Sequence, residues 1–313
     1  MTHDEASRLY IVAQRGRPEA GVPAQLADST LARRERVIES LRDHLAAHWP
    51  AVVDVEAIRA RHVQAPDVDD EGPPAWAQAR RLAGLRDSTL ACELRDLGAF
   101  FRWCRKRGLA DVRLEPMRVA ANGRPTILET ARVRTLIDGQ TEPMARLSLS
   151  LLACLGLRQG EARGLRAEDW DAERRVLTLP NGDRETTKRH GRALPVGPRL
   201  AALLDGRPRA DAGTLLSWKG RPLVSQITRW CNPTGRSKWA DPAHVEPHDL
   251  RRWFVNTLDA WQCPPEWADV LAGHVSPSIK RHYVNPTLEQ LRVWLARVET
   301  EVLGETGARP AAG

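Results

Sequence analysis

The stretch from Val112 to Thr130 constrains the fold more than any other, because it separates two long regions of helical pattern. Its prolines, glycine and arginines follow no apolar period, which is typical of a linker between domains. At 313 residues the chain is long enough for two domains of ordinary size. We therefore expect a linker over residues 113–123 with one domain on each side of it.

Two helical patterns precede the linker. Apolar residues recur at helical spacing between Val37 and Trp49 and again between Leu90 and Cys104, on either side of an acidic, proline-containing loop. These patterns predict a smaller helical domain over residues 29–112, preceded by a loose N-terminal arm over residues 1–28. The second helix ends in cations that suit a helix C-terminus and could equally contact a phosphate backbone: Arg102, Arg105, Lys106 and Arg107.

The region after the linker is predicted to be mainly α-helical with a small sheet. The apolar run LSLSLLACLGL (147–157) is typical of a buried helix, and an apolar stripe with helical spacing runs from Leu288 to Val302. Between them, apolar and polar residues alternate on both sides of Asn181-Gly182, which predicts a small antiparallel sheet. We expect this second domain to span residues 124–303, followed by a flexible tail over residues 304–313.

Composition narrows the function classes. The net charge of +7 and the pI near 9.6 favour a polyanionic partner. The longest apolar runs are too short to span a bilayer, and the N-terminus lacks the apolar core of a secretory signal. The 5 cysteines are odd in number and scattered, which suits reduced thiols in a cytosol. We expect a cytoplasmic protein without a membrane partner.

Several familiar catalytic and metal-binding patterns are missing from the sequence. There is no GxxxxGK[ST] phosphate loop and no Gly-x-Ser-x-Gly elbow. The HVEPH stretch (244–248) does not fit a zinc-protease helix, because its glutamate is misplaced and Pro247 would disrupt the helix. The spacing of Cys263, His274 and His282 fits no standard zinc finger. We therefore expect neither a metal nor another cofactor.

Cationic residues stand at turns and helix starts in the second half of the chain. Arg158 ends the apolar run, and Glu161 follows three residues later, so the glutamate either orients the guanidinium or forms an ordinary ion pair with it. Lys188 precedes a second turn of the expected sheet, where a lysine is usually solvated. His248 and Arg251 are three residues apart after a proline, so both project from the same side of one helical turn.

The last of these groups is LAGHVSPSIKRHY (271–283), where Tyr283 follows His274 by nine residues. With GLRQGE (156–161), HDLR (248–251) and LAGH (271–274), this tyrosine resembles the signature of the tyrosine recombinases, the phage-integrase family. The order Arg, Lys, His-x-x-Arg, Gly-His, Tyr is complete in this chain. The resemblance covers about residues 124–300 and extends more weakly to the helix RDLGAFFRWCRKRGL, which is similar to the last helix of the family's N-terminal domain.

This resemblance implies a fold and a chemistry. The fold would be that of the DNA breaking-rejoining enzymes: a helical, SAM-like core-binding domain and a mainly α catalytic domain with a small antiparallel β-sheet. The implied catalytic residues are Tyr283, Arg158, Lys188, His248, Arg251 and His274, supported by Glu161. Tyr283 would attack a scissile phosphodiester and form a 3′-phosphotyrosyl link. Because phenolate is a better leaving group than an alkoxide, the free 5′-hydroxyl could reseal the DNA without ATP.

The other catalytic roles also follow from the resemblance. Arg158, Arg251 and His274 would stabilise the charge that develops on the attacked phosphate. Lys188 would give a proton to the departing 5′-oxygen, and His248 would help to move the tyrosine proton. Further cations are candidates for DNA contact, together with the four at the end of the helix in the first domain: Arg189, Arg192, Lys280 and Arg281.

The resemblance implies double-stranded DNA as partner and a homo-tetramer acting on two duplexes in a bacterial or phage nucleoid. The apolar stripe of the C-terminal helix would then pack either onto a neighbouring protomer or onto its own domain. Two alternatives remain open at this point. One is a type IB topoisomerase, which nicks and reseals one strand, and the other is a catalytically inactive DNA-binding accessory protein.

Overall fold

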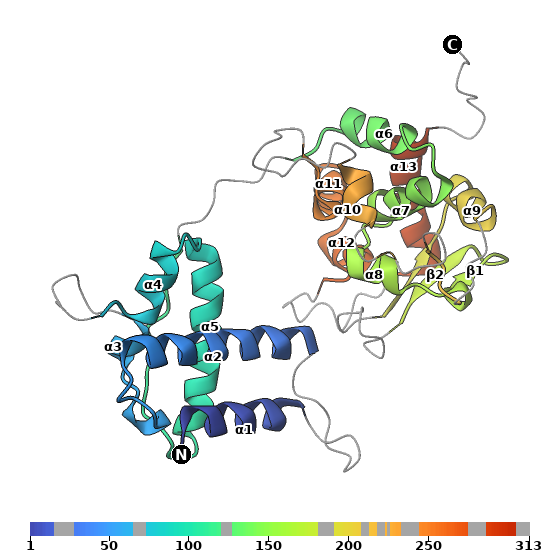
Figure 1. The fold of residues 1–313 in the computed structure, drawn as a ribbon. Coiled ribbons are helices and arrows are strands. Elements are labelled where there is room, and N and C mark those ends of the chain that lie inside the picture. Colours follow the sequence, from blue (N-terminus) through green and yellow to red (C-terminus); the bar gives the residue numbers. More distant parts are fainter. Residues whose placement is uncertain are drawn as a thin grey trace. The chain divides into compact units, whose positions relative to one another are not determined.

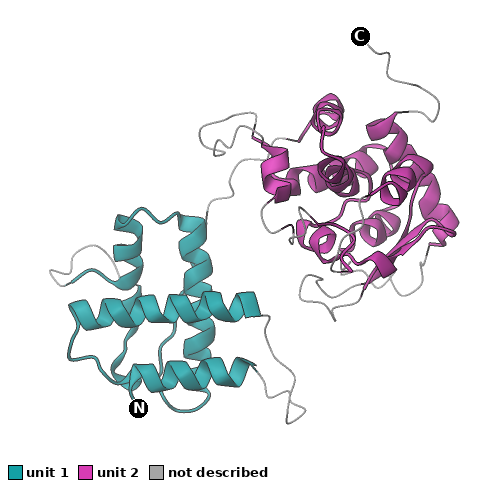
Figure 2. Ribbon diagram, turned by 45° about the vertical axis from the view of Figure 1, so that its right-hand side comes forward, with its two compact units in different colours: residues 1–123 teal, residues 124–313 magenta. Residues whose placement is uncertain are grey.

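The computed structural model describes residues 1–15, 28–64, 73–119, 127–180, 191–207, 213–217, 223, 226–232, 244–274 and 286–304. The chain divides into two compact units, residues 1–123 and residues 124–313 (Figure 2). Each unit has its own cluster of buried apolar side chains.

The first unit is helical (Figure 1). Its elements are α1 (His3–Arg15), α2 (Asp28–His48), the 3-10 helix η2 (Val55–Ala57), α3 (Ala60–Val63), α4 (Trp76–Leu82) and α5 (Asp87–Arg105). The helical faces predicted for α2 and α5 are the faces that are buried, with Leu41 and Leu97 both fully enclosed. Apolar residues three and four positions apart share one side of a helix, so burying that side removes them from water together.

The prediction of a loose N-terminal arm is wrong for the described part of that segment. Residues 3–15 form α1, which buries Ala6, Tyr10 and Ile11 against α2 and α5. The Tyr10 ring meets the Phe100 ring edge-on at a centroid distance of 5.4 Å, and its hydroxyl accepts a hydrogen bond from Arg34. The apolar face of α1 is only a few residues wide, so its periodicity is too short to be seen in the sequence, yet it is enough to dock the helix.

The second unit is mainly helical with one small sheet. Its elements are α6 (Thr130–Asp138), α7 (Pro143–Cys154), α8 (Gln159–Gly164), η3 (Ala167–Asp169), β1 (Trp170–Asp171), β2 (Val176–Leu179), β3 (Arg192–Pro195), α9 (Pro198–Asp205), α10 (Gln226–Cys231), α11 (Pro247–Ala260), α12 (Pro265–Ala272) and α13 (Leu288–Leu303). The described helices include none that is both long and apolar enough to cross a membrane.

The predicted antiparallel sheet is present and has the order β1-β2-β3. Leu177 pairs with Leu194 across β2 and β3, and both are fully buried. The first strand was not predicted, because its two residues are too few to show an alternating pattern. The Asn181-Gly182 turn lies outside the described residues.

Helix α7 is the centre of this unit. Every residue from Met144 to Cys154 is buried except Arg146, and α9, α10, α11 and α13 all pack against it. The apolar stripe of α13 belongs to the same cluster, with Leu295 and Val298 almost completely enclosed. The C-terminal helix therefore packs against its own domain, which is one of the two arrangements considered from the sequence.

Candidate active site

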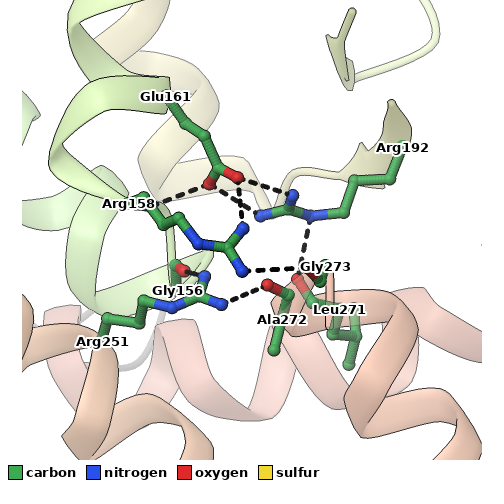
Figure 3. A network of polar contacts seen from close by, with 8 residues as sticks. All are labelled: Gly156, Arg158, Glu161, Arg192, Arg251, Leu271, Ala272 and Gly273. Carbon is green, nitrogen blue, oxygen red and sulfur yellow. Dashed lines mark hydrogen bonds and ion pairs between the residues drawn. The ribbon is translucent and has the colours of Figure 1, made fainter. Parts of the chain in front are cut away.

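Four segments that are distant in sequence meet at one place in the second unit (Figure 3). Arg158 and Glu161 come from the start of α8, directly after α7, and Arg251 comes from α11. The end of α12 contributes the backbone of residues 271–273, and β3 contributes Arg192. The structure thus brings together the two arginines that the sequence motifs predicted.

Arg158 is fixed at both its backbone and its side chain. Its backbone N–H donates to Glu161 Oε2 at 2.8 Å, which caps the first turn of α8. Its guanidinium donates through Nη1 to Glu161 Oε1 at 2.7 Å and through Nη2 to the Gly273 carbonyl at 3.0 Å. The ion pair predicted from the spacing of these residues is present, and the Arg158 side chain remains 31% exposed. It can therefore meet a ligand without losing its support.

Glu161 is buried between two guanidinium groups. Arg192 donates to both of its oxygens, at 3.1 and 3.0 Å, while Arg158 contacts the same carboxylate from the other side. Burial alone would raise the pKa of Glu161, but the hydrogen bonds and charge of Arg192, followed by those of Arg158, outweigh it and hold the pKa below its ordinary value. The carboxylate is therefore ionised at neutral pH and is shared between the two arginines.

Arg251 is almost completely enclosed, with 3% of its surface exposed. Its guanidinium donates to the carbonyl oxygens of Gly156 and Ala272, so it connects the segment before Arg158 to the end of α12. Burial, and then the positive charge of Arg158, lower the pKa of Arg251 to about 10. Gly156 has a φ of +59° and lies against the Phe254 ring, where a Cβ atom has no room.

The two histidines of the motifs border this cluster. His248 stands in the first turn of α11, where it is exposed, and burial followed by the charges of Arg252 and Arg251 lowers its pKa. His274 follows α12 after Gly273, and its Nδ1 lies 3.6 Å from Asp269 Oδ1. Burial of its ring, and then the charges of Arg251 and Arg158, lower the pKa of His274. Both imidazoles are therefore neutral near pH 7.

Gly273 has a φ of +62° and ends α12 in the left-handed conformation. The space that a Cβ atom would need there is taken by the Arg192 guanidinium. A glycine at this position lets the chain turn so that the Gly273 carbonyl faces Arg158 and His274 follows immediately. The positive φ and the lack of room for a Cβ atom therefore explain why the LAGH motif has a glycine at this position.

The prediction that Arg192 contacts DNA is wrong. Only 9% of Arg192 is exposed, and its Nε donates to the Leu271 carbonyl at 3.1 Å in addition to the two bonds to Glu161. A signal of this was present in the sequence. Side chains alternate between the two faces of a strand, so Arg192 lies on the same face as Leu194, which is buried.

The other predicted residues divide into two groups. The cations at the end of α5 are exposed, and Arg107 lies over the Trp103 ring at 4.2 Å from its centroid. Some of the predicted residues lie outside the described residues: Tyr283, Lys188, Arg189, Lys280 and Arg281. Within the described ranges, no three His, Cys, Asp or Glu side chains are grouped so as to hold a metal ion.

The arrangement has the chemistry of an anion site. Arg158 and Arg192 pair with one carboxylate, and Arg251 adds a third guanidinium near Arg158, which leaves a surplus of positive charge in a partly enclosed place. Each of the three also donates to a backbone carbonyl, so they do not need to reorganise when a negative charge arrives. Arginine forks of this kind match the oxygens of a phosphate.

No protein-family model matches the chain. Curated relatives do match it. A tyrosine recombinase XerC from Mycobacterium sp. (strain KMS) is 29% identical over 238 residues, which cover 70% of this chain and 78% of the relative. A tyrosine recombinase XerC from Methylobacterium sp. (strain 4-46) is 28% identical over 228 residues, covering 67% of this chain and 70% of the relative.

Solved structures share the fold. The Tn1549 transposon integrase in complex with circular intermediate DNA superposes with a TM-score of 0.64 at 18% identity, covering 94% of this chain and 98% of that one. A lambda integrase dimer bound to a COC′ core site gives a TM-score of 0.62 at 17% identity, covering 88% of this chain and 96% of that one. The expected fold of two helical domains, the second with a small antiparallel sheet, is confirmed. In sequence the chain is thus similar to tyrosine recombinases, and in fold it is similar to integrases.

Proposed function

We propose that this chain is a site-specific DNA recombinase that cuts and rejoins DNA through a covalent link to Tyr283. The observation that carries the proposal is the cluster formed by Arg158, Arg251 and the turn at Gly273. That turn leads directly into His274, and Tyr283 follows nine residues later in the sequence. A phosphate held by the two arginines would therefore lie within a short chain distance of a phenol.

The proposed reaction begins at the tyrosine. His248, whose lowered pKa keeps its ring neutral near pH 7, accepts the proton of the Tyr283 hydroxyl. The phenolic oxygen then attacks the scissile phosphorus, and the bond from phosphorus to the 5′-oxygen breaks. Lys188 gives a proton to the leaving oxygen, so that the products are a 3′-phosphotyrosyl link and a free 5′-hydroxyl. In the reverse direction, a 5′-hydroxyl from the same or another duplex displaces the tyrosine.

The described residues act on the charge of the phosphate. Negative charge grows on the non-bridging oxygens as the five-coordinate transition state forms, and the guanidinium groups of Arg158 and Arg251 are already in place to receive it. His274 adds a neutral N–H donor beside them, consistent with its lowered pKa. The phosphodiester energy is kept in the phosphotyrosyl bond, because phenolate leaves readily, and resealing therefore needs no ATP.

We further propose that the first unit binds the duplex through the exposed end of α5. Arg102, Arg105, Lys106 and Arg107 supply positive charge there without lying in the catalytic cluster. Each phosphate contact of this type makes binding weaker at higher salt. Relatives in the solved structures include a lambda integrase tetramer bound to a Holliday junction, and a tetramer on two duplexes in the cytoplasm is the working assembly that we propose for this chain.

The test is covalent capture. The full chain is incubated with fragmented genomic DNA from its source organism, protein-bound fragments are recovered under denaturing conditions, and their ends are sequenced. A duplex nicked beside the mapped phosphate then traps the adduct for kinetics. We expect an adduct with the wild type, none with Tyr283→Phe, and a normal amount with Arg146→Gln, whose exposed pair with Asp138 lies away from the cluster.

Two results would contradict the proposal. An adduct that persists with Tyr283→Phe would mean that another residue is the nucleophile, and a wild type without any adduct would favour the inactive accessory protein. Joining of strands from two different duplexes separates a recombinase from a type IB topoisomerase. Relaxation of supercoils without such joining would favour the topoisomerase.

A further inference from the structure

Arg192 is a buried cation that the proposed reaction does not use. It stands at the first position of β3, and its donors Nη1, Nη2 and Nε all go to residues around the catalytic cluster: Glu161 Oε1 at 3.1 Å, Glu161 Oε2 at 3.0 Å and the Leu271 carbonyl at 3.1 Å. A buried charge is costly unless it is fully paired, so an arginine in this place needs a reason beyond packing.

We propose that Arg192 is a positioning residue for the strand-cleavage reaction, holding Glu161 and the end of α12 so that Arg158 and His274 face the phosphate. The proposal rests on the proposed function. Figure 3 shows the arrangement, with Glu161 between the two guanidinium groups and the α12 backbone beside both. Arg192 itself is buried, and its Nε, Nη1 and Nη2 all donate to groups of the protein.

The charge of Arg192 affects Arg158 through Glu161. Glu161 has one negative charge, and it is divided between Arg192 and Arg158. If Arg192 lost its charge, the carboxylate would pair with Arg158 alone and neutralise most of its positive charge. The partly exposed Arg158 guanidinium, which is proposed to bind a phosphate, would then be committed to an internal ion pair. Arg192 therefore keeps Arg158 available to the substrate.

The Arg192 side chain also shapes the end of α12. The Arg192 guanidinium fills the space beside Gly273 and donates to the carbonyl of Leu271, so it contacts two of the last three residues before His274. The Gly273 carbonyl in turn accepts from Arg158. One side chain thus sets both the place where α12 ends and the carboxylate that orients Arg158.

Arg192 is also close in sequence to the proposed proton donor. Arg192 follows Lys188, the proposed proton donor, by four residues in the sequence. Lys188 lies outside the described residues, and β3 begins at Arg192. The bonds from Arg192 to Glu161 thus fix the chain four positions after Lys188 to a residue that orients Arg158.

The experiment compares three variants of the full chain on the nicked duplex. Arg192→Gln removes the charge, Arg192→Lys keeps it with fewer donors, and Arg146→Gln is the control for loss of an exposed arginine from the same unit. The measurements are the first-turnover rate of adduct formation at saturating DNA, its pH profile, and the thermal unfolding midpoint. Substituting a residue that only orients the groups at a site typically lowers activity by about 10- to 100-fold. We expect a loss of that size in the rate of adduct formation by Arg192→Gln.

The pH profile separates positioning from a merely structural role. The charged groups that act on His274 are Arg251, Arg158 and Arg192, which lower its pKa together with burial, and Asp269, which raises it. Removing the Arg192 charge should therefore raise the pKa of His274 and move the acidic limb of the profile to higher pH. Arg192→Lys should leave that limb in place and recover part of the rate.

A double-mutant cycle tests the route through Glu161. If Arg192 acts on Arg158 through this carboxylate, the effects of Arg192→Gln and Glu161→Gln on the rate should be strongly non-additive. Wild-type rate and pH profile in Arg192→Gln would overturn the inference, and so would a rate loss that merely follows the unfolded fraction in all Arg192 variants. Should Arg192→Gln fail to fold, Arg192→Lys and Glu161→Gln decide by the same criteria. A wild type without adduct refutes the proposed function instead.

Discussion

Lowering the pH from about 7.5 to about 5 should destabilise residues 1–123, because His3 is buried there without a hydrogen-bond partner. Only 4% of His3 is exposed, and both ring nitrogens lack a partner among the described residues. The ring instead meets Phe100 edge-on at 5.9 Å. Burial first, and then the charge of Arg42, lower the pKa of His3 from 6.5 to about 4, against a small opposing effect of Asp4.

The sign follows from the two pKa values. Because the folded pKa lies below the unfolded one, the unfolded chain takes up the proton first, so the stability supplied by the neutral ring is complete above 6.5 and is lost as the pH falls toward 4. One pKa unit corresponds to about 1.36 kcal/mol. At pH 5 the unfolded ring is about 1.5 units below its pKa and the folded ring is still neutral, so the loss is about 2 kcal/mol.

The assay is urea unfolding of the full chain at both pH values, followed by amide hydrogen exchange of α1 and α5 so that only the first unit is read. His3→Leu keeps an apolar side chain against Phe100 but cannot titrate, and every other group is the same in both proteins. The wild type should lose about 2 kcal/mol more than His3→Leu between the two pH values. Equal losses would refute the conclusion that His3 is folded in as a neutral ring.

Two further predictions concern the second unit. Gly273→Ala should lower the stability of this unit by about 1–3 kcal/mol, because alanine resists the positive φ and its Cβ would displace the Arg192 guanidinium. The rate of adduct formation should fall by more than the unfolded fraction explains. A stable, fully active variant would contradict this. Leu295→Ala should lower the free energy of unfolding by about 2–5 kcal/mol, because it leaves a cavity between α13 and α7. Urea unfolding measures this loss, and Val293→Ala at an exposed position of the same helix is the control. Equal effects of the two substitutions would show that α13 is not packed in its own domain.

The sequence predicts those structural features that depend on residues close together in the chain. The helical stripes of α2, α5 and α13 are periodic patterns, α7 contains a continuous apolar run, and the pair of Arg158 and Glu161 follows from a spacing of three residues. The pair of Arg192 and Glu161 joins residues 31 positions apart, and no local rule brings a strand start to a helix start. For the same reason Arg192 was predicted to face DNA, although its alternation with Leu194 already placed it on the buried face.

The weakest predictions concern short elements. The α1 helix docks through a few apolar residues, and β1 has two residues, so neither gives a period long enough to recognise. Their formation depends on surfaces that exist only after the rest of the unit has folded. Arg34, for example, donates to the Tyr10 hydroxyl from a guanidinium that also pairs with the buried Asp96.

The enclosure of α7 has a consequence for how the molecule opens. Amide groups in a helix covered on all sides exchange with solvent only when the whole domain unfolds, whereas exposed helices open at lower free energy. Arg158 follows the last residue of α7 by four positions, and Arg251 is anchored to the Gly156 carbonyl between them. The arginine pair is thus mounted on what we expect to be the slowest-exchanging segment of the second unit. We expect a helix at the edge of the unit, such as α6, to open at a lower free energy than α7, so the phosphate-facing groups can keep their geometry while it does.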